Sequence, residues 1–244
     1  MIQDYDSSKA AWDYYCCIYR DKKVFRDFDM ECPMLSWEKR GWRPNPSDGR
    51  YLGYLRENSE LRETYGRFFA LAGDCLFNFN PKKTAAFAPF ADTEELKSRL
   101  RYCASKHHSL ENLALMPATG GLNCLKGLLY LRDGGIQCAG QGQFEKTAYD
   151  RPDTLICCLN EYFEHGDELA LCVSTAMNRD CLRAFLDSFS DVYHYCETMY
   201  LMDAKMTERM LRSGTISIDS PERLRAYLVL ACDYWETKRQ TAAA

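Results

Sequence analysis

The sequence predicts a mainly α fold: a compact helical domain with a small irregular or β insertion near residues 110–145. Apolar residues recur at helical spacing in three C-terminal stretches, which are residues 151–166, 179–203 and 220–238. Between the first of these and the N-terminal half, "LALMP" is typical of a short strand, and residues 133–150 are rich in glycine. We therefore expect one domain over residues 1–244, with a possible N-terminal subregion, 1–80, and a C-terminal helical subregion, 92–240.

The sequence of the N-terminal half predicts fewer helices and strands than that of the C-terminal half. A helix is expected over residues 8–20, followed by an irregular stretch, 29–56, that contains three prolines. A second helix is expected from Asn58 to just before Pro81. Residues 80–91 are predicted to form a linker or an extended crossing between helices. Asp92 then opens a helix whose first turn is acidic, as the helix dipole favours.

The three C-terminal stretches predict a helical array. Residues 151–166 form one amphipathic helix that ends at Gly166, and residues 179–203 form either one bent helix or two. The last helix begins near Ser220, which is a favourable N-cap, and Pro221 suits the first helical position.

Composition limits the classes of function. The 244 residues are 46% hydrophobic and 27% charged, with a formal net charge of −4. This balance is that of an ordinary soluble domain, and it argues against a duplex-binding protein with a generally basic surface. No run approaches the ~18 apolar residues that span a bilayer, and the N-terminus lacks the pattern of a signal peptide. We expect a cytoplasmic protein that does not enter a membrane.

The chain contains thirteen cysteines, but their spacing does not indicate a metal or disulfide framework. None forms the Cys-x-x-Cys pair typical of zinc sites. Most are therefore interpreted as small buried apolar residues of a reduced protein. No cofactor is expected, because the glycine pairs lack the spacing of phosphate-binding or dinucleotide-binding loops.

The stretch "KHHSLENLALMPATGGLNCLKG", residues 106–127, partly resembles a His-Asn-His nuclease half-site. In such a site His107 or His108 would activate water, and Asn112 or Asn123 would orient a metal or a base. These sites place a further histidine on a separate upstream strand, and no histidine precedes His107 in this chain. The alternative is that the stretch forms a helix end, a short buried strand and a turn.

Two further groups are candidate binding residues. Asp187, Asp191 and His194 stand at helical spacing and are candidates for metal ligands, although a solvated helix face explains them without a metal. Residues 36–56 alternate arginine with aromatic side chains, a composition typical of interface hot spots and of single-strand binding. The candidate binding residues there are Trp37, Arg40, Trp42, Arg43, Arg50 and Tyr51.

The C-terminal half resembles an uncharacterised bacterial family with a domain of unknown function. The resemblance lies in "LENLALMPATGGLNCLKG", "YDRPDTLICCLNEYF" and "LRAFLDSFSDVYHYCETMYLMD". The resemblance implies a largely helical fold, and it assigns no activity. We expect a bacterial or phage protein. In the family pattern Asp150, Arg151 and Asp153 lie where a loop meets a helix. They form either a polar anion site, or a helix cap with an arginine that pairs with a neighbour.

These observations favour a non-enzymatic interaction protein over an enzyme. The expected partner is a protein bound through residues 36–56, and a nucleic acid is the alternative partner, single-stranded rather than duplex. The alternative function is a metal-dependent nuclease of the His-Asn-His type, or a degenerate relative of one.

Overall fold

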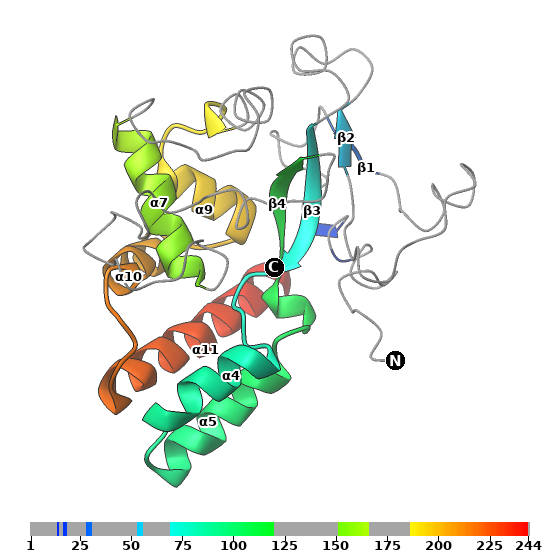
Figure 1. Ribbon diagram of the computed structural model, residues 1–244. Helices are drawn as coiled ribbons and strands as arrows, with labels where there is room; N and C mark the ends of the chain where they lie inside the picture. Colours follow the sequence, from blue (N-terminus) through cyan, green and yellow to red (C-terminus); the bar gives the residue numbers. More distant parts are fainter. Residues whose placement is uncertain are drawn as a thin grey trace.

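Figure 1 shows the computed structural model of the chain, in which helices dominate and a small sheet lies to one side. The structure describes residues 14, 17–18, 28–30, 53–55, 69–119, 151–165 and 186–243. Over these residues the predicted mainly α fold is confirmed. Of the helix expected at 8–20, Tyr14, Cys17 and Ile18 have helical conformation, and the remainder lies outside the described residues.

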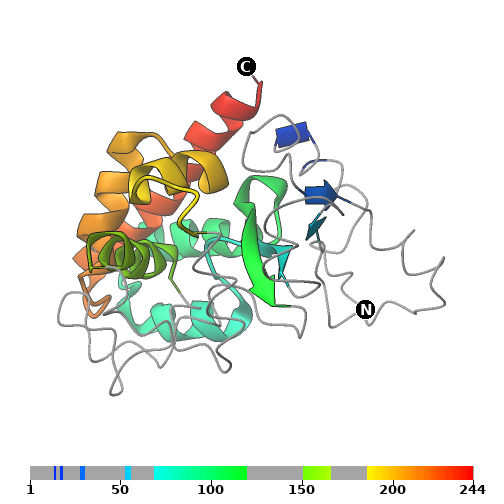
Figure 2. The ribbon, with the colours of Figure 1, turned by 90° about the horizontal axis from the view of Figure 1, so that it is seen from above.

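Within the described residues the sheet has four antiparallel strands in sequence order. They are β1 (Phe28–Met30), β2 (Gly53–Leu55), β3 (Phe69–Cys75) and β4 (Leu113–Thr119). The β3–β4 pairing is the longest, and its register places Cys75 opposite Leu113. The expected "LALMP" strand is thus confirmed as part of β4. The sheet lies on the side of the molecule away from helix α10 (Ala204–Gly214) in both views (Figures 1 and 2).

The helix predicted from Asn58 to Pro81 is wrong over residues 69–75, which form strand β3. Cross-strand pairing with β4 overrides the helical propensity of its alanines and leucine. The pairing continues past the strand, where the backbone N–H of Leu76 donates to the Asn112 carbonyl at 2.6 Å. The irregular stretch predicted at 29–56 likewise contains β2 and most of β1.

The linker predicted over residues 80–91 is also wrong, because α4 (Pro81–Phe87) and the short 3-10 helix η4 (Ala88–Phe90) occupy it. Asn80 caps α4, and its side chain accepts from the Lys83 N–H at 2.9 Å. Pro81 takes the first helical position, where its missing N–H costs nothing. The Asn-Pro pair therefore starts a helix here instead of marking a turn.

Four of the remaining helices agree with the sequence pattern: α5 (Glu94–Ser105), α7 (Pro152–His165), α9 (Val192–Tyr200) and α11 (Pro221–Ala243). The 3-10 helix η5 (Leu110–Asn112) and helix α10 were not predicted from the sequence. The stretch expected as one bent helix or two is interrupted at residues 187–191, before α9 begins. Leu201, in left-handed conformation with φ of 56°, ends α9 and directs the chain towards α10.

Helix α11 lies between two helical groups, with α4 and α5 on one side and α7, α9 and α10 on the other (Figure 1). Its buried residues recur every three or four positions, which puts them on the faces that meet these neighbours. Aromatic rings join α11 to the segment after β3: Phe77 lies 5.8 Å from Trp235 and 5.7 Å from Tyr227, measured between ring centroids. The core is therefore built around α11.

Helices α7 and α10 approach each other very closely at Gly214. A Cβ atom at this position would lie 2.3 Å from the Asp153 carbonyl oxygen and 2.6 Å from the Cys157 sulfur. Only glycine, which has no Cβ, allows the C-terminal end of α10 to contact the backbone of α7. This contact fixes the start of the loop, residues 215–220, that leads into α11.

Candidate functional site

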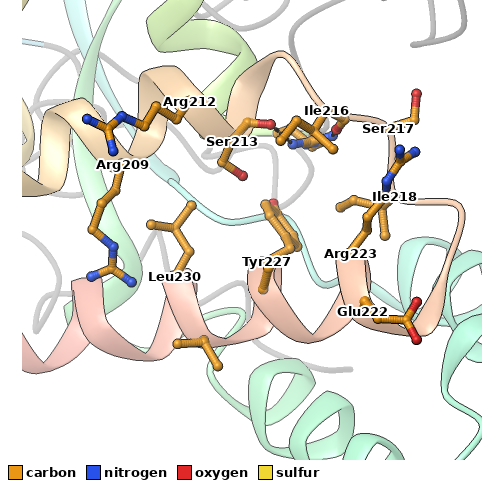
Figure 3. Close-up of a pocket in the computed structure, with 13 residues that line it drawn as sticks. Arg209, Arg212, Ser213, Ile216, Ser217, Ile218, Glu222, Arg223, Tyr227 and Leu230 are labelled. Carbon is orange, nitrogen blue, oxygen red and sulfur yellow. Dashed lines mark hydrogen bonds between the residues drawn. The ribbon is translucent and has the colours of Figure 1, made fainter.

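A groove of about 460 Å³ lies between the end of α10, the loop that follows it and the first half of α11. Its volume is within the range of ligand-binding pockets. Figure 3 shows Tyr227 and Leu230 extending from α11 towards the chain at Ser213 and Ile216. We call it the arginine-rimmed groove, lined by Arg151, Arg209, Arg212, Ser213, Ile216, Ser217, Ile218, Glu222, Arg223, Ala226, Tyr227, Val229 and Leu230.

The floor of the groove is apolar. It consists of two isoleucines from the loop and the α11 side chains that face them, of which Tyr227 and Leu230 are buried. Ile216 is 45% exposed, which makes it one of the few large apolar side chains that the described residues present to solvent. Apolar surface that is open to solvent next to a concavity is characteristic of binding sites.

The rim of the groove carries exposed arginines. Arg209 and Arg212 come from the last turns of α10, and Arg223 comes from the first turn of α11. Each pairs with an acidic residue that does not itself line the groove: Arg209 with Asp233 at 2.7 Å, Arg212 with Glu208, and Arg223 with Asp219 at 2.7 Å. Among the described residues that line the groove, Glu222 is the one acidic side chain. The lining itself therefore forms a basic rim around an apolar floor.

Arg151 also lines the groove, and it is held by buried contacts. Its guanidinium pairs with Asp153 through two hydrogen bonds, of 3.0 Å from Nε and 2.5 Å from Nη2. It also donates to the carbonyls of Ser213 and Ile216, at 2.9 and 2.7 Å, and lies over the Tyr227 ring. Burial lowers the pKa of Arg151, but the Asp153 carboxylate outweighs it, and the net shift is upwards.

These contacts favour the interpretation of Arg151 and Asp153 as part of a helix start in which the arginine pairs with a neighbour, over the interpretation as a polar anion site. Asp153 accepts the Thr154 N–H at 3.0 Å in the first turn of α7, and Arg151 binds the carbonyls at the end of α10. Arg151 thereby fixes the loop that carries Ile216. The buried pair is not itself an open anion site.

The structure places His107, His108 and Asn112 together at the end of α5 and in η5. The two imidazole rings lie 4.2 Å apart between centroids, and Nδ1 of His107 is 3.4 Å from the Phe79 backbone N–H, which donates to it. Asn123, the fourth candidate, lies outside the described residues. The nuclease half-site stays a prediction.

Asn112 is completely buried, and its side-chain amide is fully engaged in the fold. Oδ1 accepts from the Phe77 N–H at 2.9 Å and from Nε1 of Trp235 at 3.0 Å. Nδ2 donates to the carbonyls of Phe77 and His107, at 2.8 and 2.7 Å. An amide has two donors and two acceptor sites, and all four are used here. To orient a metal or a base, Asn112 would have to break these bonds.

The metal candidates Asp187, Asp191 and His194 do not share one helix face. Asp187 lies in the break before α9 and accepts from the Tyr162 hydroxyl at 2.8 Å. Asp191 is the N-cap of α9, and its pKa is lowered by the hydrogen bond from the His194 N–H. Over the residues that the structure describes, no cluster of three or more His, Cys, Asp or Glu side chains is arranged to hold a metal ion.

The candidate contact residues at 36–56 lie outside the described residues, so their role stays a prediction. They are Trp37, Arg40, Trp42, Arg43, Arg50 and Tyr51. None of the helices in the described ranges combines the length and apolar character needed to cross a membrane.

Sequence reasoning missed the arginine-rimmed groove, because residues 204–219 contain no recognisable motif. The available signal was the spacing of Arg209 and Arg212 by three residues, followed by two isoleucines in a short loop. Comparison with known proteins does not add to this geometry: no family model, no curated protein and no solved structure matches the chain. The resemblance to an uncharacterised bacterial family therefore stays a prediction.

Proposed function

We propose that the protein is a non-enzymatic interaction protein, and that the arginine-rimmed groove binds an acidic, amphipathic segment of a protein partner. The observation that carries the proposal is the combination of an apolar floor that includes the exposed Ile216 with a rim of three arginines. Peptide segments that bind in grooves insert apolar side chains at helical spacing and place their polar side chains at the rim.

The charges favour an acidic partner over a basic one. The chain has a net charge of −4, so a basic rim is a local departure from the overall charge. The existing partners of Arg212 and Arg223 are exposed acids on the same helix or the adjoining loop, in pairs of a kind that contribute little to stability. A carboxylate of the partner can therefore replace them at small cost, and such an exchange gives specificity and faster association.

The surface is also suited to an interface in its residue types. Arginine and tyrosine are enriched in interface hot spots, and an apolar centre with a polar rim is the usual anatomy of a protein–protein contact. The same reasoning underlies the prediction that the arginines and tryptophans of residues 36–56 bind a protein partner. The groove is the part of the proposal that rests on described residues.

The first test measures binding of labelled peptides to the full chain by fluorescence anisotropy. The probe is a peptide of about twelve residues with leucines at i, i+3/i+4 and i+7 and glutamates between them. The comparison probe has lysine in place of every glutamate. We expect the acidic peptide to bind at least about tenfold more tightly than the basic one, and the difference to shrink as salt is raised.

Variants then locate the binding site. Ile216→Glu and Arg212→Glu should each weaken acidic-peptide binding by about tenfold or more, because they place negative charge on the floor or the rim. Arg239→Glu is the matched control: Arg239 lies on α11 and, like Arg212, is exposed and paired with an acid, but it does not line the groove. Equal binding of acidic and basic peptides, or equal losses for Arg212→Glu and Arg239→Glu, would contradict the proposal.

A further inference from the structure

Two free cysteine thiols from distant parts of the sequence meet between α5 and α11. The Sγ atoms of Cys103 and Cys232 lie 3.9 Å apart, although the residues are 129 positions apart in the chain. A disulfide bond is about 2 Å long, so the two sulfurs need to approach each other by only about 2 Å.

The two thiols have different surroundings. Cys103 is completely buried, and its sulfur lies 4.0 Å from the Leu228 carbonyl oxygen. Cys232 is only half-buried, which leaves it within reach of a small oxidant. Arg99, one turn before Cys103 on α5, contributes positive charge near both sulfurs, whereas Asp233 is the acidic neighbour of Cys232.

These surroundings shift the pKa values of the two thiols in opposite directions. The hydrogen bond from Cys103, assisted by Arg99, lowers the pKa of Cys232 to about 7, against the opposing effects of burial and Asp233. The hydrogen bond to Cys232, together with burial, raises the pKa of Cys103. An accessible thiolate that lies beside a second thiol is the arrangement found in redox-active cysteine pairs.

We propose that Cys103 and Cys232 form an oxidation site, at which hydrogen peroxide converts the two thiols into an intrachain disulfide that links α5 to α11. The inference does not depend on the proposed function of the groove. It rests on the 3.9 Å separation, the unequal exposure and the nearby cation.

The reaction has two steps. The Cys232 thiolate attacks one oxygen of the peroxide, the O–O bond breaks, and hydroxide leaves and takes up a proton to become water. The Cys103 sulfur then attacks the sulfur of the Cys232 sulfenic acid. The S–O bond breaks, and the departing hydroxide takes the Cys103 proton. In total, two thiols lose two electrons and two protons, and one peroxide becomes two waters.

The test treats the full reduced chain with hydrogen peroxide, blocks the remaining thiols and maps the disulfides by mass spectrometry after trypsin digestion without reduction. Cleavage after Arg101, Lys106, Arg225 and Lys238 gives one peptide with Cys103 and one with Cys232, each with no other cysteine. We expect these two peptides to be joined and two hydrogens lighter than their sum. The oxidised chain should also unfold about 5–15 °C higher than the reduced chain.

Variants supply the control. Cys232→Ser should abolish both the joined peptide and the rise in Tm, whereas Cys158→Ser, which changes another half-buried cysteine, on α7, should leave both unchanged. If Cys103→Ser fails to fold, the peptide map of the unmutated chain still decides the question. Conversion of Cys232 to a sulfinic acid without the joined peptide would overturn the proposal. So would pairing of Cys232 with other cysteines as often as with Cys103.

Discussion

At the scale of single residues, the structure assigns Asn112 to the fold. Its four side-chain hydrogen bonds join η5 to the segment after β3, to the end of α5 and to α11. A buried polar group is tolerated only when it is satisfied, and a satisfied one specifies which segments meet. An asparagine that resembles part of a nuclease motif in sequence is thus accounted for by packing.

Replacing Asn112 with alanine should lower the free energy of unfolding by about 3 kcal/mol or more. The substitution leaves the Phe77 N–H and C=O and the Trp235 indole N–H buried without this partner, and each such loss is costly. Urea denaturation measures the effect. Asn160→Ala, which removes an exposed amide bonded to Glu164, should change the value by less than about 0.5 kcal/mol. A small loss for Asn112→Ala would show that these bonds are not what positions η5.

At the scale of elements, sequence patterns predicted the amphipathic helices well, because each pattern is local. Helices α5, α7 and α11 lie within a few residues of their predicted bounds. Strand β3 was missed, because its conformation depends on a partner strand about forty residues away, and its own residues favour a helix. The groove was missed for a related reason: its lining comes from α10, the loop that follows it and α11, and it forms only where these elements pack together.

Changing Gly214 should loosen the α7–α10 contact. In an exposed helix Gly214→Ala would add about 1 kcal/mol of helix propensity. Here the new Cβ would meet the Asp153 carbonyl oxygen, a backbone atom that cannot rotate away. We therefore expect a net destabilisation of about 2 kcal/mol or more, measured by denaturant unfolding.

The neighbouring residue gives a matched control. Ser213→Ala keeps the backbone carbonyl that accepts from Arg151, so stability should change by less than about 0.5 kcal/mol. A neutral or stabilising Gly214→Ala would mean that α7 and α10 separate at little cost. It would also mean that the loop carrying Ile216 is not fixed by this contact.

At the scale of the whole molecule, Lys238 joins parts of the chain that are far apart in sequence. It is completely buried on α11, donates a hydrogen bond to the Leu113 carbonyl at the start of β4, and lies over the rings of Tyr14 and Tyr234. Burial lowers the pKa of Lys238 to about 7, although Glu111 acts in the opposite direction. A buried ammonium therefore makes global stability depend on pH.

The sign of this dependence follows from proton binding. In the unfolded chain a lysine has a pKa of about 10.4, so between pH ~7 and ~10 the unfolded state binds a proton that the folded state does not. Stability should therefore rise with pH across this window, by at most about 1.4 kcal/mol per pH unit. Stability is therefore highest above pH ~10 and decreases as pH falls towards 7; below that value both states are protonated and the effect levels off.

Lys238→Met isolates this contribution. Urea unfolding of the reduced protein at several pH values should show the unmutated chain gaining about 2 kcal/mol relative to the variant between pH ~7 and ~9. Titration of Cys232 is common to both proteins and cancels in the difference. Lys97→Met, which changes a half-exposed lysine on α5, should show no such trend. If the difference in free energy of unfolding between Lys238→Met and the unmutated chain stays constant over this pH range, Lys238 keeps its proton in the folded state. The contacts with the Leu113 carbonyl and the two tyrosine rings would then hold a charged ammonium.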